Sequence, residues 1–323
     1  MTTRTFDFGQ LIDPISSSVF LEEYWKKQAL HIARHTQDYY SSLFSLQDLD
    51  HLMQFHRLKY PLINPITNRS EWLDLLEGMN TSSLESYGVP DLFRLYRNYI
   101  QGDTFICHRL HQYLPEMAKL CHSIAGFFTH PVSSHLFFTH KDSNVCLPHY
   151  DLDEIFVLQL EGGKLWQLYN TTAVTPDLYW QPAANEPLPT PEQEIYLEAG
   201  DMLYVPAGCV HGVKTVSESS VHLTIGVLPF TGVDLLKSAI ASVQDHSAFS
   251  EALPIDWLSS PGEMQEKLIN LIRKLPQQVQ LKSAIAPLAQ HFLDELPPQD
   301  SFSDQNLKLE VEIAKYLELL EKS

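Results

Sequence analysis

Three residues in the middle part of the chain could hold a metal ion together. His149 and Asp151 are two apart in PHYDLDEIF, and on an extended segment residues at this spacing point to the same face. A third ligand, His211, follows the Gly-Asp and Pro-Ala-Gly turns in the stretch that ends CVHGV. Two imidazoles and one carboxylate on one face of a metal leave its other positions open, as iron(II) needs to bind a cosubstrate and dioxygen together. Zinc tolerates the same ligands, so the residue types alone leave the metal open.

A chance His-x-Asp is common in a chain with 15 histidines, and a second one exists at His140 and Asp142. That pair lies in THKDSN, a polar stretch typical of a turn, with no strand running on from it. The pair at His149 instead leads into EIFVLQL, which is typical of a buried strand. The sequence therefore favours the pair that contains His149.

Other residues near these segments carry weaker signals. His108 and His111 have the i, i+3 spacing of one helix face, but without a third partner we interpret them as surface or core histidines. Glu154 follows soon after Asp151 and could support the metal ligands, although an exposed strand position is the simpler interpretation.

The metal ligands need a rigid frame, and the segment from His135 to Pro229 supplies candidate strands. About eight short β-like runs alternate with turns rich in Gly, Pro and Ser, a pattern that favours a closed or nearly closed antiparallel barrel or sandwich. We therefore place a β core at residues 131–229.

The flanking segments have a different spacing of apolar residues. Residues 16–50 indicate helix, short strand and helix, residues 80–130 indicate further helices, and helical spacing returns after Pro229. The predicted organisation is a mixed helical segment at 1–130, the β core, and a helical region at 230–323. Four aromatic residues are expected to pack the N-terminal segment against the core: Tyr24, Trp25, Tyr39 and Tyr40.

Composition narrows the class of protein. The 323 residues carry a formal net charge of −18, which disfavours direct binding to nucleic acid or anionic membranes and would steer a basic protein or peptide towards the surface. The four cysteines are widely spaced without a CxxC, so neither a zinc ribbon nor a secreted disulfide framework fits. No signal peptide or membrane span is evident, and we expect a cytoplasmic protein.

Longer motifs resemble one known family. PHYDLDEIFVLQLEGGKLWQLY, LEAGDMLYVPAGCVHGV and SVHLTIGV closely resemble the JmjC-type ribosomal oxygenases, which are 2-oxoglutarate-dependent protein hydroxylases. The resemblance extends to FLEEYWKKQALHIARH near the N-terminus and to GVDLLKSAIASVQ, which is similar to the start of that family's helical dimerisation region. It implies an α+β fold with a double-stranded β-helix (jelly-roll, cupin-like) core, Fe(II), 2-oxoglutarate and O2, and a homodimer.

The resemblance also assigns individual residues. His149, Asp151 and His211 match the iron ligands, and Lys164 matches the basic residue that pairs with the distal carboxylate of 2-oxoglutarate. A lysine inside an apolar barrel is costly to bury unless an anion compensates it, which agrees with this role. Thr224 matches a hydroxyl that can bond the same carboxylate.

The chain departs from the family at two places. His135 and Phe137 stand where the family usually carries an asparagine and then a tyrosine, so one hydrogen bond to the cosubstrate is lost. His135 could act as a donor in the cosubstrate pocket or be a core histidine. The sequence also shows no complete winged helix of the family's kind, which leaves the substrate open.

Three functions remain at this point. The first is hydroxylation of a basic protein such as a ribosomal protein, and the second is hydroxylation of a small molecule or short peptide. The third is a non-catalytic, cupin-like binding protein, which the presence of all three ligands and Lys164 disfavours.

Overall fold

The computed structural model describes residues 6–52, 63–66, 99–141, 148–172, 190–297 and 304–320. They belong to two compact units. One is formed by residues up to Leu228, and the other by Pro229–Leu296 with the C-terminal helix.

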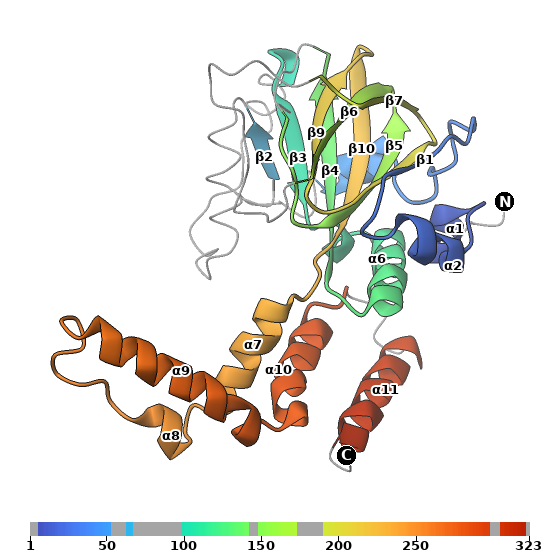
Figure 1. Cartoon of the computed structure of the whole chain (residues 1–323). Helices are drawn as coiled ribbons and strands as arrows, with labels where there is room; N and C mark the ends of the chain where they lie inside the picture. Colours follow the sequence, from blue (N-terminus) through green and yellow to red (C-terminus); the bar gives the residue numbers. More distant parts are fainter. Residues whose placement is uncertain are drawn as a thin grey trace. The chain divides into compact units, whose positions relative to one another are not determined.

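Two antiparallel sheets make up the first unit (Figure 1). The large sheet contains, in spatial order, β1 (Leu30–Ile32), β8 (Met202–Val205), β5 (Glu154–Glu161), β10 (Ser219–Val227), β4 (Val132–His140), β3 (Thr104–His108) and β2 (Ile63–Ile66). The small sheet contains β7 (Gln193–Glu198), β6 (Gly163–Thr172) and β9 (Cys209–Thr215). This arrangement confirms the predicted double-stranded β-helix.

Strand β5 shows why the apolar run EIFVLQL folds as it does. Ile155 and Val157 point to the inside of the barrel, where they join a cluster with residues of both sheets: Trp166, Leu168, Ile195, Leu197, Leu203 and Val205. Between them Phe156 points to the opposite face and contacts Phe8 and Phe20. The strand is apolar on both faces because both are covered.

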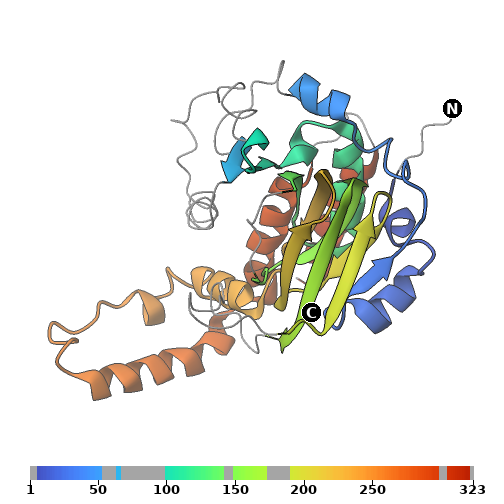
Figure 2. The same ribbon diagram turned by 90° about the horizontal axis from the view of Figure 1, so that it is seen from above.

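Short helices cover the outer face of the large sheet: α1 (Phe8–Ile12), α2 (Ser17–Val19) and α6 (Pro115–Phe128). The Trp25 ring stacks on Phe128 at 4.1 Å and lies 6.1 Å from Tyr204 of β8, while Tyr40 is buried. The aromatic residues at the N-terminus therefore do pack against the barrel. Figure 2 shows α1 and α2 beside the strands from a second direction.

Two elements differ from the sequence-based expectation. The helix expected after Ser16 is only α2 followed by a π-helical turn, Phe20–Tyr24. Residues 104–108, expected to be helical, form β3, which pairs with β4 in the large sheet. The N-terminal segment thus contributes strands to the barrel as well as helices that cover it.

The second unit is helical. It contains α7 (Gly232–Ala241), α8 (Ser247–Ser250), α9 (Pro261–Gln278), α10 (Leu281–Asp294) and α11 (Asp304–Leu320). Thr231 and Asp234 form a capping box that starts α7, and the Ser238 hydroxyl donates to the Ala284 carbonyl oxygen of α10 at 2.6 Å. Among the described residues, no helix is long and apolar enough to cross a membrane.

Candidate metal centre

His149 and His211 lie opposite each other on two antiparallel segments. The N–H of His149 donates to the His211 carbonyl at 2.9 Å, and the N–H of His211 donates back at 2.7 Å. Their ring centroids are 4.5 Å apart. Backbone pairing therefore brings the two imidazoles to one side of the barrel, although 61 positions separate them in the chain.

The third group completes a site that fits a metal ion. Asp151 Oδ2 lies 3.6 Å from His211 Nε2, and ligand atoms of His149, Asp151 and His211 all lie within 4.8 Å of one another. His211 Nδ1 is 3.0 Å from the Cys209 carbonyl, so it donates there and leaves Nε2 facing the other two groups. The two ligands predicted from strand spacing and the third predicted from turns thus come together.

The electrostatics favour a neutral imidazole in this site. Burial, and next the neighbouring His149, lower the pKa of His211 to about 4, while Asp151 acts in the opposite direction. A neutral imidazole offers its Nε2 lone pair to a cation, and Asp151, half exposed, leaves one side of the group accessible.

Lys164 lies inside the barrel on β6. Its side chain is only 2% exposed, and Nζ donates to Thr139 Oγ1 of β4 at 3.1 Å. Lys164 and Trp166 are two residues apart on β6, so their side chains point to the same face of the strand. The Trp166 ring lies 5.4 Å from the His211 ring, so Trp166 lies between Lys164 and the candidate metal ligands along this face. The lysine predicted to be internal is internal.

His135 and Thr224 lie opposite each other on β4 and β10. His135 is partly buried, with Nδ1 2.8 Å from His108 Nδ1 and Nε2 3.0 Å from Ser133 Oγ. Burial lowers the pKa of His135 well below its ordinary value. Both of its ring nitrogens therefore have protein partners, as a core histidine would, and a cosubstrate role for His135 or Thr224 stays a prediction.

His108 and His111 are core histidines, but not on a helix. His108 ends β3 and His111 lies in the 3-10 turn Leu110–Gln112, because Arg109 between them has φ 55°. The Ser134 backbone N–H donates to His111 Nδ1 at 3.2 Å. Of the second His-x-Asp pair, His140 ends β4 rather than lying in a turn, and Asp142 lies outside the described residues.

The expectation for Glu154 was wrong. It is 2% exposed and accepts a short hydrogen bond from the Tyr204 hydroxyl of β8. Burial raises the pKa of Glu154. Its neighbour Asp153 is partly buried, and desolvation, followed by the charges of Asp151 and Glu154, raises the pKa of Asp153 to about 7. The hydrogen bond between Glu154 and Tyr204 thus holds the segment after Asp151 against β8.

Sequence reasoning missed three polar groups in the barrel. Trp166 Nε1, Thr215 Oγ1 and His222 Nδ1 are buried and have no hydrogen-bond partner within the described part of the chain. Thr215 pairs with Lys164 across β6 and β9, and the charge of Lys164 acts on His222. The alternation in KLWQLY and in SVHLTIGV could have placed Trp166 and His222 on inner faces.

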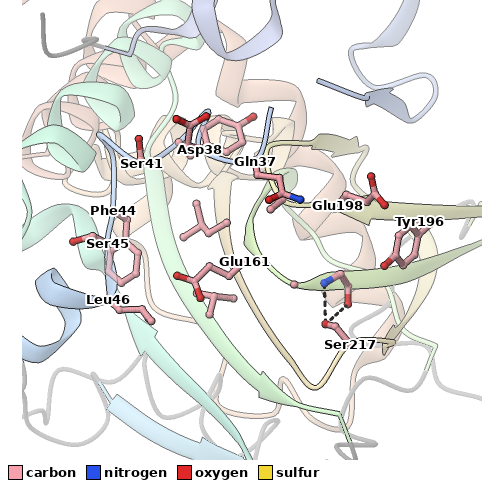
Figure 3. Close-up of a pocket in the computed structure, with 16 residues that line it drawn as sticks. Gln37, Asp38, Ser41, Phe44, Ser45, Leu46, Glu161, Tyr196, Glu198 and Ser217 are labelled. Atoms are coloured by element: carbon pink, nitrogen blue, oxygen red, sulfur yellow. Dashed lines mark hydrogen bonds between the residues drawn. The ribbon is translucent and has the colours of Figure 1, made fainter. Parts of the chain in front are cut away.

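A separate pocket of about 610 Å³ lies where the β5–β6 turn meets the segment that follows β1 (Figure 3). Its lining includes the carboxylates of Asp38, Glu161 and Glu198 and the aromatic rings of Phe44 and Tyr196, and the described lining residues include no Lys or Arg. None of the three metal-ligand candidates lines it.

Known proteins resemble this chain over most of its length. The family model of the JmjC domain matches residues 107–235. The bifunctional lysine-specific demethylase and histidyl-hydroxylase NO66 of Drosophila mojavensis is 29% identical over 313 residues, which cover 89% of this chain and 34% of that protein. Ribosomal oxygenase 2 of Rattus norvegicus is 30% identical over 288 residues, 84% of this chain and 60% of that protein. The chain thus spans less than two thirds of either relative.

Solved structures share the fold. The X-ray structure of Escherichia coli ycfD covers 85% of this chain and 71% of its own, with a TM-score of 0.56 and 15% identity. A structure of YcfD, a ribosomal oxygenase from the same organism, in complex with cobalt and 2-oxoglutarate has a TM-score of 0.52 and 15% identity, and covers 84% of this chain and 71% of its own.

Proposed function

We propose that this chain, which matches the JmjC domain over residues 107–235 and is similar to ribosomal oxygenases, is an Fe(II)- and 2-oxoglutarate-dependent oxygenase that hydroxylates a protein side chain. The observation that carries the proposal is the convergence of His149, Asp151 and His211 within 4.8 Å at the wall of a barrel that also encloses Lys164.

His149, Asp151 and His211 would hold the iron. Two neutral imidazoles and a carboxylate are a donor set that suits Fe(II) and leaves positions open for other ligands. Fe(II) with 2-oxoglutarate supplies the activation of O2 that inserts one oxygen atom into a C–H bond of the substrate. The backbone bridge between His149 and His211 fixes the direction of both rings, and the Cys209 carbonyl holds the His211 tautomer.

The barrel interior suits the distal carboxylate of 2-oxoglutarate. Lys164 places a cation in the buried interior of the barrel. Trp166 Nε1 and Thr215 Oγ1, which have no hydrogen-bond partner among the described residues, lie on the same inner face of the small sheet. Binding of an anion there would compensate the buried charge of Lys164 and orient the cosubstrate towards the iron ligands. The apolar residues packed beneath exclude water from this end of the barrel.

A basic protein, such as a ribosomal protein, is the proposed substrate. The formal net charge of −18 and the carboxylates of Asp38, Glu161 and Glu198 around the pocket of Figure 3 support a positively charged partner. The names of the relatives, a histidyl-hydroxylase and a ribosomal oxygenase, point to the same substrate class. A small molecule or short peptide is the alternative.

We further propose a homodimer formed by the helical unit, in the cytoplasm. Helix α7 exposes Val233, Leu236 and Ile240, whose exposed fractions are 58%, 57% and 55%. Their i, i+3, i+7 spacing places them on one face of the helix, and an exposed apolar face of this kind supports contact with a second copy. The wide spacing of the cysteines supports a reducing compartment.

The substrate is tested by mass spectrometry. Basic ribosomal proteins are incubated with the purified chain, Fe(II), ascorbate and 2-oxoglutarate, beside a His149→Ala variant. We expect one peptide to gain the mass of one oxygen atom with the wild type only. Succinate formation without any such gain would move the substrate to the small-molecule class. Absence of both products would favour a binding protein.

A further inference from the structure

His222 is a buried histidine whose ring is fixed by aromatic neighbours. It lies on β10 with 4% of its surface exposed, and its ring stacks on Phe137 of β4 at 4.6 Å with 11° between the planes. The Trp166 ring approaches it edge-on at 6.2 Å. Cross-strand pairing of His222 with Phe137 sets this arrangement, so the ring direction follows from the register of the sheet.

The polar atoms of this ring point to a missing partner. Nδ1 is buried and has no hydrogen-bond partner among the described residues, a condition that is unfavourable for the folded chain. Neither of the rings packed on His222 offers a good acceptor. Burial, and next the charge of Lys164, lower the pKa of His222 well below its ordinary value, so the ring is neutral and carries one N–H donor.

The surroundings favour an anion as that partner. The positive charge of Lys164, on β6, acts on the pKa of His222. Two further buried groups on the small sheet, Trp166 Nε1 and Thr215 Oγ1, have no hydrogen-bond partner among the described residues. Polar groups from both sheets, one of them the cation of Lys164, thus lie around the same part of the interior. A carboxylate would satisfy several of these groups at once.

Phe137, on which His222 stacks, differs from the residue that is usual at this position. The family that this chain resembles usually has a tyrosine at this position. Phe137 lacks the hydroxyl of that tyrosine and therefore cannot donate the hydrogen bond that the hydroxyl would make. The His222 ring lies flat against the Phe137 ring at 4.6 Å, so an imidazole lies next to the residue that lacks this hydroxyl.

We propose that His222 donates a hydrogen bond to the distal carboxylate of 2-oxoglutarate, together with Lys164, and so replaces the donor that Phe137 cannot supply. The inference rests on the proposed function, because it names a further binding residue for the same cosubstrate. It also predicts that the His222 and Phe137 positions are coupled: a donor is needed at one of them.

Calorimetry of 2-oxoglutarate binding to the Mn(II)-loaded chain without O2 tests this coupling. His222→Leu should weaken binding about 10-fold or more, the range for a lost hydrogen bond to a charged group. Phe137→Tyr added to His222→Leu should restore most of the affinity. 2-Oxopentanoate, which has a methyl group in place of the distal carboxylate, should bind wild type and His222→Leu equally.

The outcomes separate the inference from the function. Equal 2-oxoglutarate affinity in wild type and His222→Leu overturns the inference, as does an equal loss for 2-oxopentanoate. No binding of 2-oxoglutarate by the wild type overturns the proposed function itself. If His222→Leu does not fold, 15N-histidine NMR of the Zn(II)-loaded wild type replaces it: 2-oxoglutarate should shift the His222 N–H signal downfield and 2-oxopentanoate should not, and an unchanged signal overturns the inference.

Discussion

His149 and His211 donate backbone hydrogen bonds to each other, at 2.9 and 2.7 Å, and this pairing sets the separation of their rings. Because this pairing is made by the backbone of the chain rather than by a ligand, we expect the metal site to be formed before metal binds. A preformed site needs little reorganisation, so binding of a cation translates directly into stability of the folded chain.

Replacing a ligand should remove metal binding without unfolding the barrel. His149→Ala and Asp151→Ala each leave two ligands, and we expect Co(II) affinity to fall at least 100-fold, with loss of the metal-dependent rise in melting temperature. Absorption spectroscopy of Co(II) titrations and thermal melts measure both effects. His140→Ala, in the other His-x-Asp pair, is the control and should bind as wild type does. Unchanged Co(II) binding by both ligand variants would refute the site.

Lys164→Met should weaken 2-oxoglutarate binding without lowering the free energy of unfolding. The change removes a buried cation but keeps the volume of the side chain, so the free energy of unfolding should stay the same or rise. Affinity for 2-oxoglutarate should fall about 100-fold, since a charged partner of the carboxylate is lost. Lys214→Met, on the exposed face of neighbouring β9, is the matched control. A Lys164→Met variant that binds 2-oxoglutarate normally would remove this residue from the site.

Acid should destabilise the chain through His108 and His111. Burial, and next the charge of Arg109, lower the pKa of both to about 4 from an ordinary value of 6.5. Between these values the unfolded chain binds more protons than the folded one, so stability is complete above pH 6.5 and falls as pH drops towards 4. The loss is at most about 3 kcal/mol per histidine.

His111→Asn tests the origin of this loss. The asparagine Oδ1 can accept the Ser134 N–H that His111 Nδ1 accepts now, and it does not titrate in this range. Urea unfolding from pH 7.5 to 4.5 should show a shallower decline for this variant than for wild type. The exposed His35→Asn change should leave the slope unaltered. Identical slopes for His111→Asn and wild type would exclude His111 as a source.

The exposed face of α7 should hold the dimer together. A double change, Leu236→Glu with Ile240→Glu, places charges on the apolar face and should convert the species to a monomer of 36.9 kDa in light scattering. Lys237→Glu reverses a charge beside this face and should leave the mass unchanged. A monomeric wild type would contradict the proposed dimer.

The sequence predicted the barrel from local periodicity, and the candidate ligands from strand spacing, turns and the family resemblance together. A spacing of two residues places His149 and Asp151 on one face in any extended segment. Glu154 was misjudged because its burial depends on Tyr204 of β8, a partner 50 residues away that no local pattern reveals. His222 was overlooked for the same reason, since its importance comes from Phe137 across the strand pair.

The helical interpretation of His108 and His111 failed for a different reason. A spacing of three residues is shared by a helix face and by a strand that ends in a tight turn, and Arg109, with φ 55°, produces the second. Strand β3 then has its partner in β4, 24 or more positions further on, beyond any sequence window used to recognise a helix.

Succinate formation tests the central claim most directly. Purified wild type and His149→Ala are incubated with Fe(II), ascorbate, O2 and 2-oxoglutarate, with and without basic ribosomal protein, and succinate is measured by NMR. Our account predicts succinate from the wild type, stimulated by the protein substrate, and none above background from the variant. Equal succinate from both, or none from a wild type that binds Fe(II) and 2-oxoglutarate, would contradict an oxygenase centred on His149, Asp151 and His211.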